Sequence, residues 1–180
     1  YAHIKNFKNI HQVALAKSEI ISNIKKNGHL VLNRDDKFYN LHKKIAKGKD
    51  INILTFSLKN KSANVFLKKI VKEKSKYKII INIDKKNTFF YVKSIFENNL
   101  KNLLSAIAII SIFKDLQILN KNIFLDYVVT KGRGDITRVK LNKKSIYLVD
   151  ESYNSNPLSL KSAIKNFDEL NIDNSKKKLI

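Results

Sequence analysis

Eight consecutive residues near the end of the chain constrain its fold more than any other segment: Asp150-Glu151-Ser152-Tyr153-Asn154-Ser155-Asn156-Pro157. They follow a β-type run at 145–149 and precede an amphipathic helical pattern that begins at Pro157. Proline suits the first position of a helix because its missing N–H is not needed there. A strand, a polar turn and a helix in this order place carboxylates and amides beside a helix N-terminus, where phosphates and polar ligands bind in α/β proteins.

The rest of the chain alternates between helical and strand-like patterns. Apolar residues at helical spacing predict helices, and runs rich in Ile, Val, Phe and Tyr predict half-buried strands. The helical segments are 9–26 (which Gly28 would end), 38–46, 99–114, 157–170 and a short one near 116–119. The strand-like segments are 29–33, 51–56, 63–71, 77–83, 88–92 and a hairpin of 136–141 with 145–149. We therefore expect an α/β fold.

The formal net charge of +21 alone would suggest a nucleic acid or an anionic membrane as partner. The positive charge, however, comes from 33 Lys and only 3 Arg, spread along the chain and accompanied by 22 Asn. Proteins that recognise nucleic acids usually use Arg for bidentate contacts with bases and phosphates. Compositional drift is the better interpretation, and no nucleic-acid partner is expected.

Cysteine is absent, which excludes disulfides and thiolate chemistry and fits a reducing compartment. No signal peptide is visible. The longest apolar stretch, 103–113, is shorter than the roughly 20 residues that span a bilayer, so no membrane span is expected. The chain lacks an initiator Met and ends on a strand-like Lys178-Leu179-Ile180, so we expect an internal piece of a longer protein.

Lys17 is the single residue of greatest chemical interest. It follows Ile10 by seven residues and precedes Ile24 by seven, which places it on the predicted apolar stripe with Val13, Ala14, Ile20 and Ile21. An inward lysine loses hydration, and its uncharged amine can take up CO2 as a carbamate. The alternative is a lysine whose head reaches solvent past the edge of the core.

The eight-residue string closely resembles the D-[DE]-S-Y-N-[AS]-N-P signature of the Mur ligase family. Ala2-His3, Phe7 and the run from Ala14 to Ile20 resemble that family's A-H-L-x-x-F…A-x-A-K-x-E-I stretch. The resemblance implies that His3 and Lys17, the latter as a carbamate, hold Mg²⁺ and serve catalysis. It also implies that the 32–36 segment, Leu32-Asn33-Arg34-Asp35-Asp36, is the family's L-N-x-D-D loop. An Asx-rich turn explains that loop equally well, and we expect a mainly structural role.

The resemblance further implies an ATP site. Asn102 matches an asparagine near the adenine, although Phe96 and Asn98 stand where the family has Gly and His. Arg133, in the only Gly-dense segment, would reach the ATP phosphates with its planar fork of donors, or else be an ordinary exposed hinge arginine. Glu151 would contact the nucleotide.

Asn154, Asn156 and Ser159 match positions beside the incoming amine substrate. Helix capping explains Asn156 equally well. The D-E-S-Y-N-S-N-P string points to the branch of the family that joins D-Ala-D-Ala to UDP-MurNAc-tripeptide with ATP and Mg²⁺, through an acyl phosphate, in peptidoglycan precursor synthesis. The implied parent enzyme is cytoplasmic, bacterial and monomeric.

The expected organisation has two parts. Residues 1–131 would be the C-terminal part of a central ATPase domain, with a mixed sheet and flanking helices. Residues 132–180 would begin a Rossmann-like C-terminal domain. No G-x-x-G-K-[ST] phosphate-binding loop occurs, so the chain alone should be inactive. The alternatives are another Mur-type or folylpolyglutamate-type amide ligase and, with less support, a basic nucleic-acid-binding module.

Overall fold

The computed structural model describes residues 7–127, 130–142, 144–153 and 157–170. The chain forms two compact units, one made of residues 5–127 and the other containing residues 128–180. The first unit contains α1 (Ile10–Ser18), the 3₁₀-helix η2 (Glu19–Asn23), β1 (His29–Asn33), α2 (Tyr39–Ala46), β2 (Asn52–Ser57), β3 (Val65–Glu73), β4 (Lys76–Ile83), β5 (Lys86–Val92) and α3 (Glu97–Phe113). The second contains β6 (Asp135–Leu141), β7 (Lys144–Asp150) and α4 (Pro157–Glu169).

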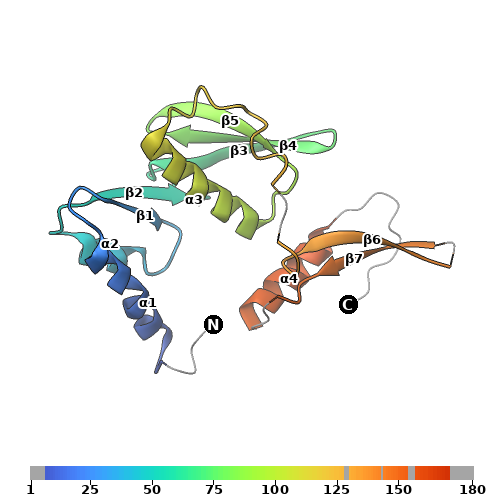
Figure 1. The fold of residues 1–180 in the computed structure, drawn as a ribbon, viewed down its shortest axis with the longest axis horizontal. Coiled ribbons are helices and arrows are strands. Elements are labelled where there is room, and N and C mark those ends of the chain that lie inside the picture. The colour runs from blue at the N-terminus through green and yellow to red at the C-terminus, as the bar shows by residue number, and fades with distance from the viewer. Residues whose placement is uncertain (1–6, 128–129, 143, 154–156, 171–180) are drawn as a thin grey trace. The chain divides into compact units, whose positions relative to one another are not determined.

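The first unit is built on a five-stranded mixed sheet in the order β1-β2-β3-β4-β5. β1, β2 and β3 run parallel, whereas β4 pairs antiparallel with β3 and β5 pairs antiparallel with β4 (Figure 1). Parallel neighbours need crossover connections, which α2 supplies between β1 and β2, while tight turns suffice for the antiparallel strands. The predicted α/β fold is confirmed.

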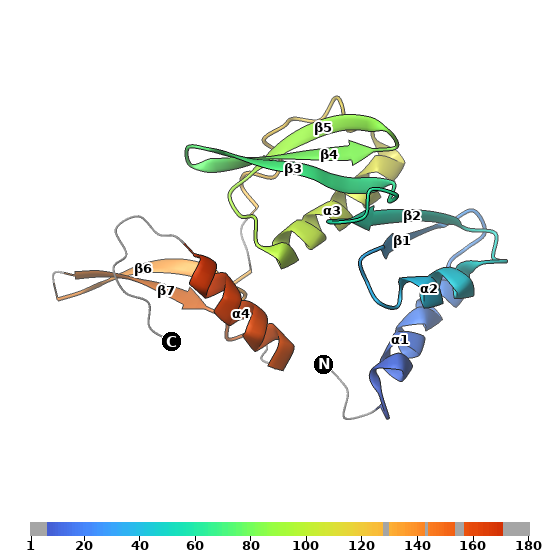
Figure 2. The same ribbon diagram turned by 180° about the vertical axis from the view of Figure 1, so that it is seen from behind.

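The larger core lies between α3 and this sheet, which the helix crosses on one face (Figures 1 and 2). The helix contributes Leu100, Leu104, Ile107 and Ala108, all nearly inaccessible to solvent. Alternate residues of the strands face it, because successive side chains of a strand point to opposite faces. The sheet's main contributions are Phe56, Val65, Ile79, Ile81, Phe90 and Val92.

A smaller core covers the opposite face of β1 and β2. Leu30 and Leu32 of β1 point into it, whereas the intervening Val31 packs on the larger core. Ile21 of η2 and two residues of α2, Tyr39 and Ala46, complete it. Both faces of these parallel strands are therefore covered, as parallel sheets require.

The second unit consists of the β6–β7 hairpin followed by α4 (Figure 1). The strands pair in antiparallel register from Asp135 opposite Asp150 to Leu141 opposite Lys144. The predicted hairpin and the helix that begins at Pro157 are both confirmed.

Two predictions about helices are wrong. The pattern at 9–26 is not one α-helix, because it becomes the 3₁₀-helix η2 at Glu19 and ends at Asn23. Gly28 therefore does not end a helix; its amide donates to the carbonyl of Lys25 in a turn at 2.8 Å. Ile20, expected on the apolar stripe, is 67% exposed.

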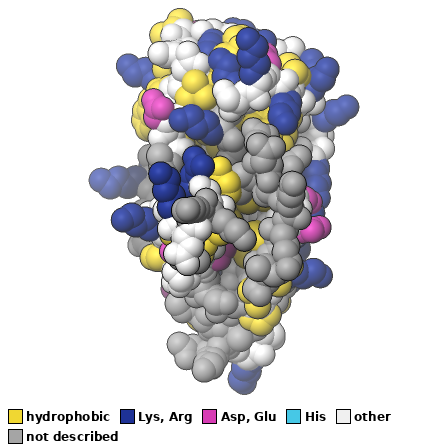
Figure 3. Space-filling view, turned by 90° about the vertical axis from the view of Figure 1, so that its right-hand side faces the viewer, with side chains coloured by type: hydrophobic (Ala, Val, Ile, Leu, Met, Phe, Trp, Pro, Cys, Tyr) yellow, Lys and Arg dark blue, Asp and Glu magenta, His cyan; other side chains and the backbone are white. Residues whose placement is uncertain are grey.

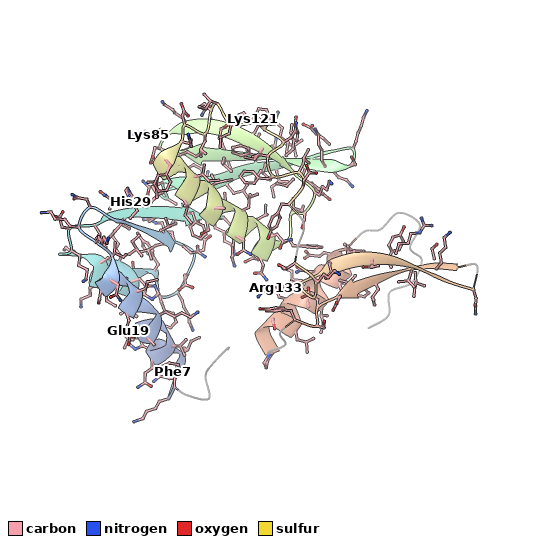
Figure 4. The ribbon with its side chains drawn as sticks, viewed as in Figure 1. Phe7, Glu19, His29, Lys85, Lys121 and Arg133 are labelled. Carbon is pink, nitrogen blue, oxygen red and sulfur yellow. The ribbon has the colours of Figure 1, made fainter. Side chains whose placement is uncertain are left out.

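The short helix expected near 116–119 is also absent. The carbonyls of Leu116 and Gln117 accept instead from the side chain of Lys121, at 3.1 and 2.9 Å, and Lys121 also donates to Thr88 of β5 (Figure 4). The loop is thus held on the sheet by side-chain contacts in place of helical hydrogen bonds. Among the described residues, no helix is long and apolar enough to cross a membrane.

Candidate functional site

The hairpin of the second unit brings two of the sequence motifs together. Because Asp135 pairs with Asp150, the Gly132-Arg133-Gly134 turn that enters β6 lies beside the Glu151-Ser152-Tyr153 segment that leaves β7. We call residues 132–135 and 150–153 the strand-end corner. It is the candidate site, and Arg133 marks its position in Figure 4.

Backbone hydrogen bonds hold the two sides of this corner together. The amide of Gly134 donates to the carbonyl of Asp150 at 2.7 Å, and the amide of Tyr153 donates to the carbonyl of Gly132 at 3.0 Å. The carboxylate of Asp135 accepts from the amide of Gly132 at 2.6 Å, which closes the turn. The relative placement of both motifs is therefore set by paired backbone groups rather than by side chains alone.

Both glycines of the turn are required by its geometry. Gly132 and Gly134 have φ angles of +76° and +88°, in the left-handed region that residues with a Cβ rarely adopt. A Cβ on Gly132 would lie 2.9 Å from the backbone nitrogen of Tyr153, and one on Gly134 would lie 3.0 Å from a carboxylate oxygen of Glu151. Only glycine permits this approach of the two segments.

Arg133 lies between these glycines, with its guanidinium carbon 4.2 Å from the centroid of the Tyr153 ring. A cation over an aromatic face at this distance is a favourable cation–π contact. Arg133 and Tyr153 are both exposed, so the guanidinium is accessible to a ligand. The corner can therefore present a planar cation to an anion in solvent.

The acidic groups of the corner differ in their proton affinity. Partial burial, followed by the nearby charges of Asp150 and Asp135, raises the pKa of Glu151. Hydrogen bonds from the side chain and backbone of Ser152 lower the pKa of Asp150. Three carboxyl groups thus share this turn, with the ionised form of Glu151 disfavoured and that of Asp150 favoured.

Of the two interpretations of Lys17, the structure agrees with the one in which the head of the side chain reaches solvent. Its side chain is exposed on α1, whose buried residues are Ala14 and Ser18. Because the α-helix stops at Ser18, Ile24 does not continue a single α-helical stripe through Lys17. Exposure leaves its amine accessible to CO2, but the structure does not provide the desolvation expected from the sequence.

Asn102 is exposed on α3, the helix that packs on the larger core, whereas α1 runs into η2 of the smaller core. Asn102 and Lys17 thus lie on helices attached to different cores. Phe96, at the glycine position of the family pattern, has φ −55° and ψ 138° immediately before α3. Any L-residue adopts this conformation, so the backbone does not require glycine there.

The loop after β1 has a structural role at Asp35, as predicted. The Asp35 carboxylate accepts from the hydroxyl of Ser57, which is fully buried, and from the amide of Leu58 at 2.6 Å. The amide of Arg34 donates to the carbonyl of Phe56 at 2.8 Å. These bonds join the ends of β1 and β2 and stabilise that edge of the sheet.

Three predicted site residues, His3, Asn154 and Asn156, lie outside the described residues. Ser159 is half-buried in the first turn of α4. The described part of the chain contains no cluster of three or more His, Cys, Asp or Glu side chains that could hold a metal ion.

Sequence reasoning missed the contribution of Tyr153 and Asp135 to the corner. Tyr153 belonged to the eight-residue string, but its partner Arg133 lies on the other side of the hairpin. The G-R-G-D spacing was the available signal, because a turn with glycines on both sides of an arginine fixes where its side chain emerges.

Residues 1–110 match the family described as the Mur ligase middle domain. The chain is 32% identical over 178 residues to UDP-N-acetylmuramoyl-tripeptide–D-alanyl-D-alanine ligase of Rickettsia prowazekii, covering 96% of this chain and 38% of that protein.

Two crystal structures have the same fold. MurF of Acinetobacter baumannii superposes with a TM-score of 0.76 at 22% identity, over 94% of this chain and 36% of that one. MurF ligase of Thermotoga maritima, in complex with ADP, superposes with a TM-score of 0.71 at 18% identity, over 92% and 36%. The chain therefore spans little more than a third of the length of these proteins.

Proposed function

Because the chain belongs to the Mur ligase middle-domain family, we propose that it forms part of an ATP-dependent ligase that adds D-Ala-D-Ala to UDP-MurNAc-tripeptide. The strand-end corner is the observation that carries this proposal, since it brings Arg133 next to the first residues of the D-E-S-Y-N-S-N-P string, which include Glu151. The relative in Rickettsia prowazekii is named UDP-N-acetylmuramoyl-tripeptide–D-alanyl-D-alanine ligase, and the Thermotoga maritima ligase was crystallised in complex with ADP.

In the proposed reaction the terminal carboxylate of the tripeptide takes the γ-phosphoryl group of ATP, which gives an acyl phosphate and releases ADP. The amine of D-Ala-D-Ala then attacks the acyl carbon, forming the amide bond and releasing phosphate and a proton. Arg133 binds phosphate oxygens, because an exposed guanidinium offers a planar fork of donors to a developing negative charge. Glu151 contacts the nucleotide and Asn102 lies near the adenine. Asn154, Asn156 and Ser159 orient the incoming amine.

Magnesium fits the donor chemistry of His3 and of Lys17 as a carbamate, because a carbamate supplies the oxygen ligands that this hard cation prefers. The exposed amine of Lys17 is accessible for that modification. A bound Mg²⁺ would neutralise charge on the phosphates. On this proposal Lys17 and His3 serve catalysis only through the ion.

The proposed parent enzyme is a cytoplasmic bacterial monomer. Residues 1–131 form the C-terminal part of its central ATPase domain, and 132–180 begin a Rossmann-like C-terminal domain. The division of the chain between 5–127 and 128–180 supports a boundary close to the Gly132-Arg133-Gly134 turn.

Other amide ligases of the same superfamily are the nearest alternative. Their motifs at this strand end often have His after the acidic residue, whereas this chain has Glu151-Ser152-Tyr153. The contact of Tyr153 with Arg133 gives that tyrosine a physical role at the site, which favours the D-Ala-D-Ala ligase.

A nucleic-acid-binding module is disfavoured by what covers its candidate aromatic residues. On β4 and β5, Lys78 lies 4.2 Å from the ring centroid of Phe89, and Lys76 lies 3.5 Å from that of Tyr91. Both rings are half-buried, whereas single-stranded nucleic acids stack on open aromatic faces. In the face shown in Figure 3, the Lys and Arg side chains are also dispersed among other residues.

The proposal is tested with the longest open reading frame that contains this chain. Phosphate release should require ATP, UDP-MurNAc-tripeptide and D-Ala-D-Ala together, and Arg133→Ala should reduce it strongly. The 180-residue chain is expected to give no turnover, because it contains no G-x-x-G-K-[ST] loop. Turnover with L-Ala or Glu but not with D-Ala-D-Ala would establish a different amide ligase.

A further inference from the structure

The three arginines of the chain differ in how their side chains are used. Arg34 donates to the carbonyl of Ser62 at 3.0 Å, and Arg138 donates to the hydroxyl of Ser145 at 3.0 Å. Within the described residues, the guanidinium of Arg133 makes no hydrogen bond or ion pair, and its contact is the ring of Tyr153. Its donors remain available to an external anion, whereas those of Arg34 and Arg138 are partly used by the protein.

The backbone at the base of both residues places the Arg133 guanidinium carbon over the Tyr153 ring. The Tyr153 amide donates to Gly132, the residue immediately before Arg133. The absence of a Cβ at Gly132 allows this approach, since that atom would meet the backbone of Tyr153. Tyr153 is thus fixed next to the base of the Arg133 side chain, although the residue as a whole is 64% exposed.

A long arginine side chain on a surface otherwise samples many rotamers, and it loses that freedom when it binds an anion. Stacking on an aromatic face restricts the guanidinium plane while leaving the N–H groups at its edge free to donate. A ring that pre-orders the cation therefore strengthens anion binding without touching the anion.

We propose that Tyr153 is a positioning residue for Arg133, holding its guanidinium flat so that its edge donors bind the phosphates of a nucleotide. The ring face does this and the hydroxyl is not required. The identity of the anion as a nucleotide phosphate rests on the proposed function. The contact between Arg133 and Tyr153 does not depend on it.

The test uses the Arg Nε–H signals in ¹H–¹⁵N NMR spectra of the 180-residue chain, which contains only three arginines. ATP is titrated into the wild-type chain, Tyr153→Phe and Tyr153→Leu, and the Kd is read from the Arg133 signal. Tyr153→Phe should keep the wild-type Kd, whereas Tyr153→Leu should weaken binding about two- to fivefold, as expected for an exposed cation–π contact. The Arg138 signal controls for non-specific binding to this basic chain.

An unchanged Kd at Arg133 in Tyr153→Leu overturns the positioning role while leaving the proposed function in place. An Arg133 signal in the wild-type chain that does not respond to ATP overturns the phosphate-binding role of Arg133 and the positioning role with it. Circular dichroism checks that each variant folds, and Tyr153→Gln, which keeps a polar exposed side chain, replaces Tyr153→Leu if the latter unfolds.

Discussion

Gly132 and Tyr153 approach so closely that the carbonyl of one accepts from the amide of the other at 3.0 Å, with room for no side chain on the glycine. This contact connects the turn before β6 to the segment after β7. The placement of Arg133, which follows Gly132, depends on it, and so does the strand-end corner.

Gly132→Ala is expected to destabilise the second unit strongly. The change forces a Cβ onto a residue with φ +76° and brings it 2.9 Å from the backbone nitrogen of Tyr153. Gly48→Ala is the control, because Gly48 has φ +90° but nothing within 4 Å of its Cβ position. Gly48→Ala should lower the free energy of unfolding by about 1–2 kcal/mol, the cost of a left-handed backbone for a residue with a Cβ, and Gly132→Ala should lower it more. Equal losses in chemical denaturation, followed separately for each unit, would contradict the role of the close contact.

Glu151→Gln is expected to stabilise the second unit at neutral pH. The pKa of Glu151 is raised in the folded chain, so its stabilising contribution is present below the unfolded-state pKa and is lost as pH rises through the folded-state pKa. Removing the charge avoids that loss, and the difference from wild type should vanish well below the usual glutamate pKa of about 4.3. Thermal unfolding as a function of pH measures it.

Asp150→Asn is expected to change the stability of the second unit in the opposite direction. The pKa of Asp150 is lowered, so its stabilisation is present above the unfolded-state pKa and is lost as pH falls through the folded-state pKa. This variant should be less stable than wild type at neutral pH and should converge with it in acid. Parallel curves for the Glu151→Gln and Asp150→Asn variants would show that the two carboxyl groups are not distinguished by their surroundings.

Asp35→Ala is expected to cost about 1–3 kcal/mol of stability in the first unit, because it leaves a buried hydroxyl and an amide without their acceptor. Those groups belong to Ser57 and Leu58. Asp36→Ala is the matched control: among the described residues, the Asp36 carboxylate accepts from the amide of Phe38 in an exposed turn, at 2.7 Å, and its loss should cost at most about 1 kcal/mol. Urea denaturation compares them, and an equal cost would mean that burial at Ser57 does not matter.

Ile107→Ala should destabilise the first unit by about 2–5 kcal/mol, since the side chain is fully buried between α3 and the sheet and its removal leaves a cavity. Ile109→Ala, two residues along the same helix, removes the same atoms from a side chain that is 47% exposed. Its effect should stay within about 0.5 kcal/mol. Similar midpoints in urea for the two variants would contradict the placement of the larger core.

Local patterns predicted the elements well wherever neighbouring residues decide them. The strand at 29–33 was predicted with its observed bounds, and Pro157 begins α4 as expected. The prediction failed at 9–26, where the backbone changes to the 3₁₀-helix η2 at Glu19. It also failed at 116–119, where the side chain of Lys121 donates to the carbonyls of Leu116 and Gln117 and to Thr88 of β5.

Some features of the candidate site were likewise predictable from the sequence and others were not. The residue types of the D-E-S-Y-N-S-N-P string and of the Gly132-Arg133-Gly134 turn were visible in the sequence, and so was their position at the ends of strands. Their proximity was not, because it depends on the register of Asp135 with Asp150. The sequence left two orientations open for Lys17, since a helical stripe predicts a buried face only while the α-helix continues, and this one ends at Ser18.

The α/β class, most strands and helices, and the polar turn at a strand end were predictable from the chain alone, since they follow from side-chain periodicity and from the restricted dihedrals of proline and glycine. The three-dimensional structure was needed to show that β3 joins β2 in parallel and β4 in antiparallel, that Lys17 is exposed, and that Tyr153 lies against Arg133. These features depend on hydrogen bonds and packing between residues far apart in the chain, whose energies no local pattern records.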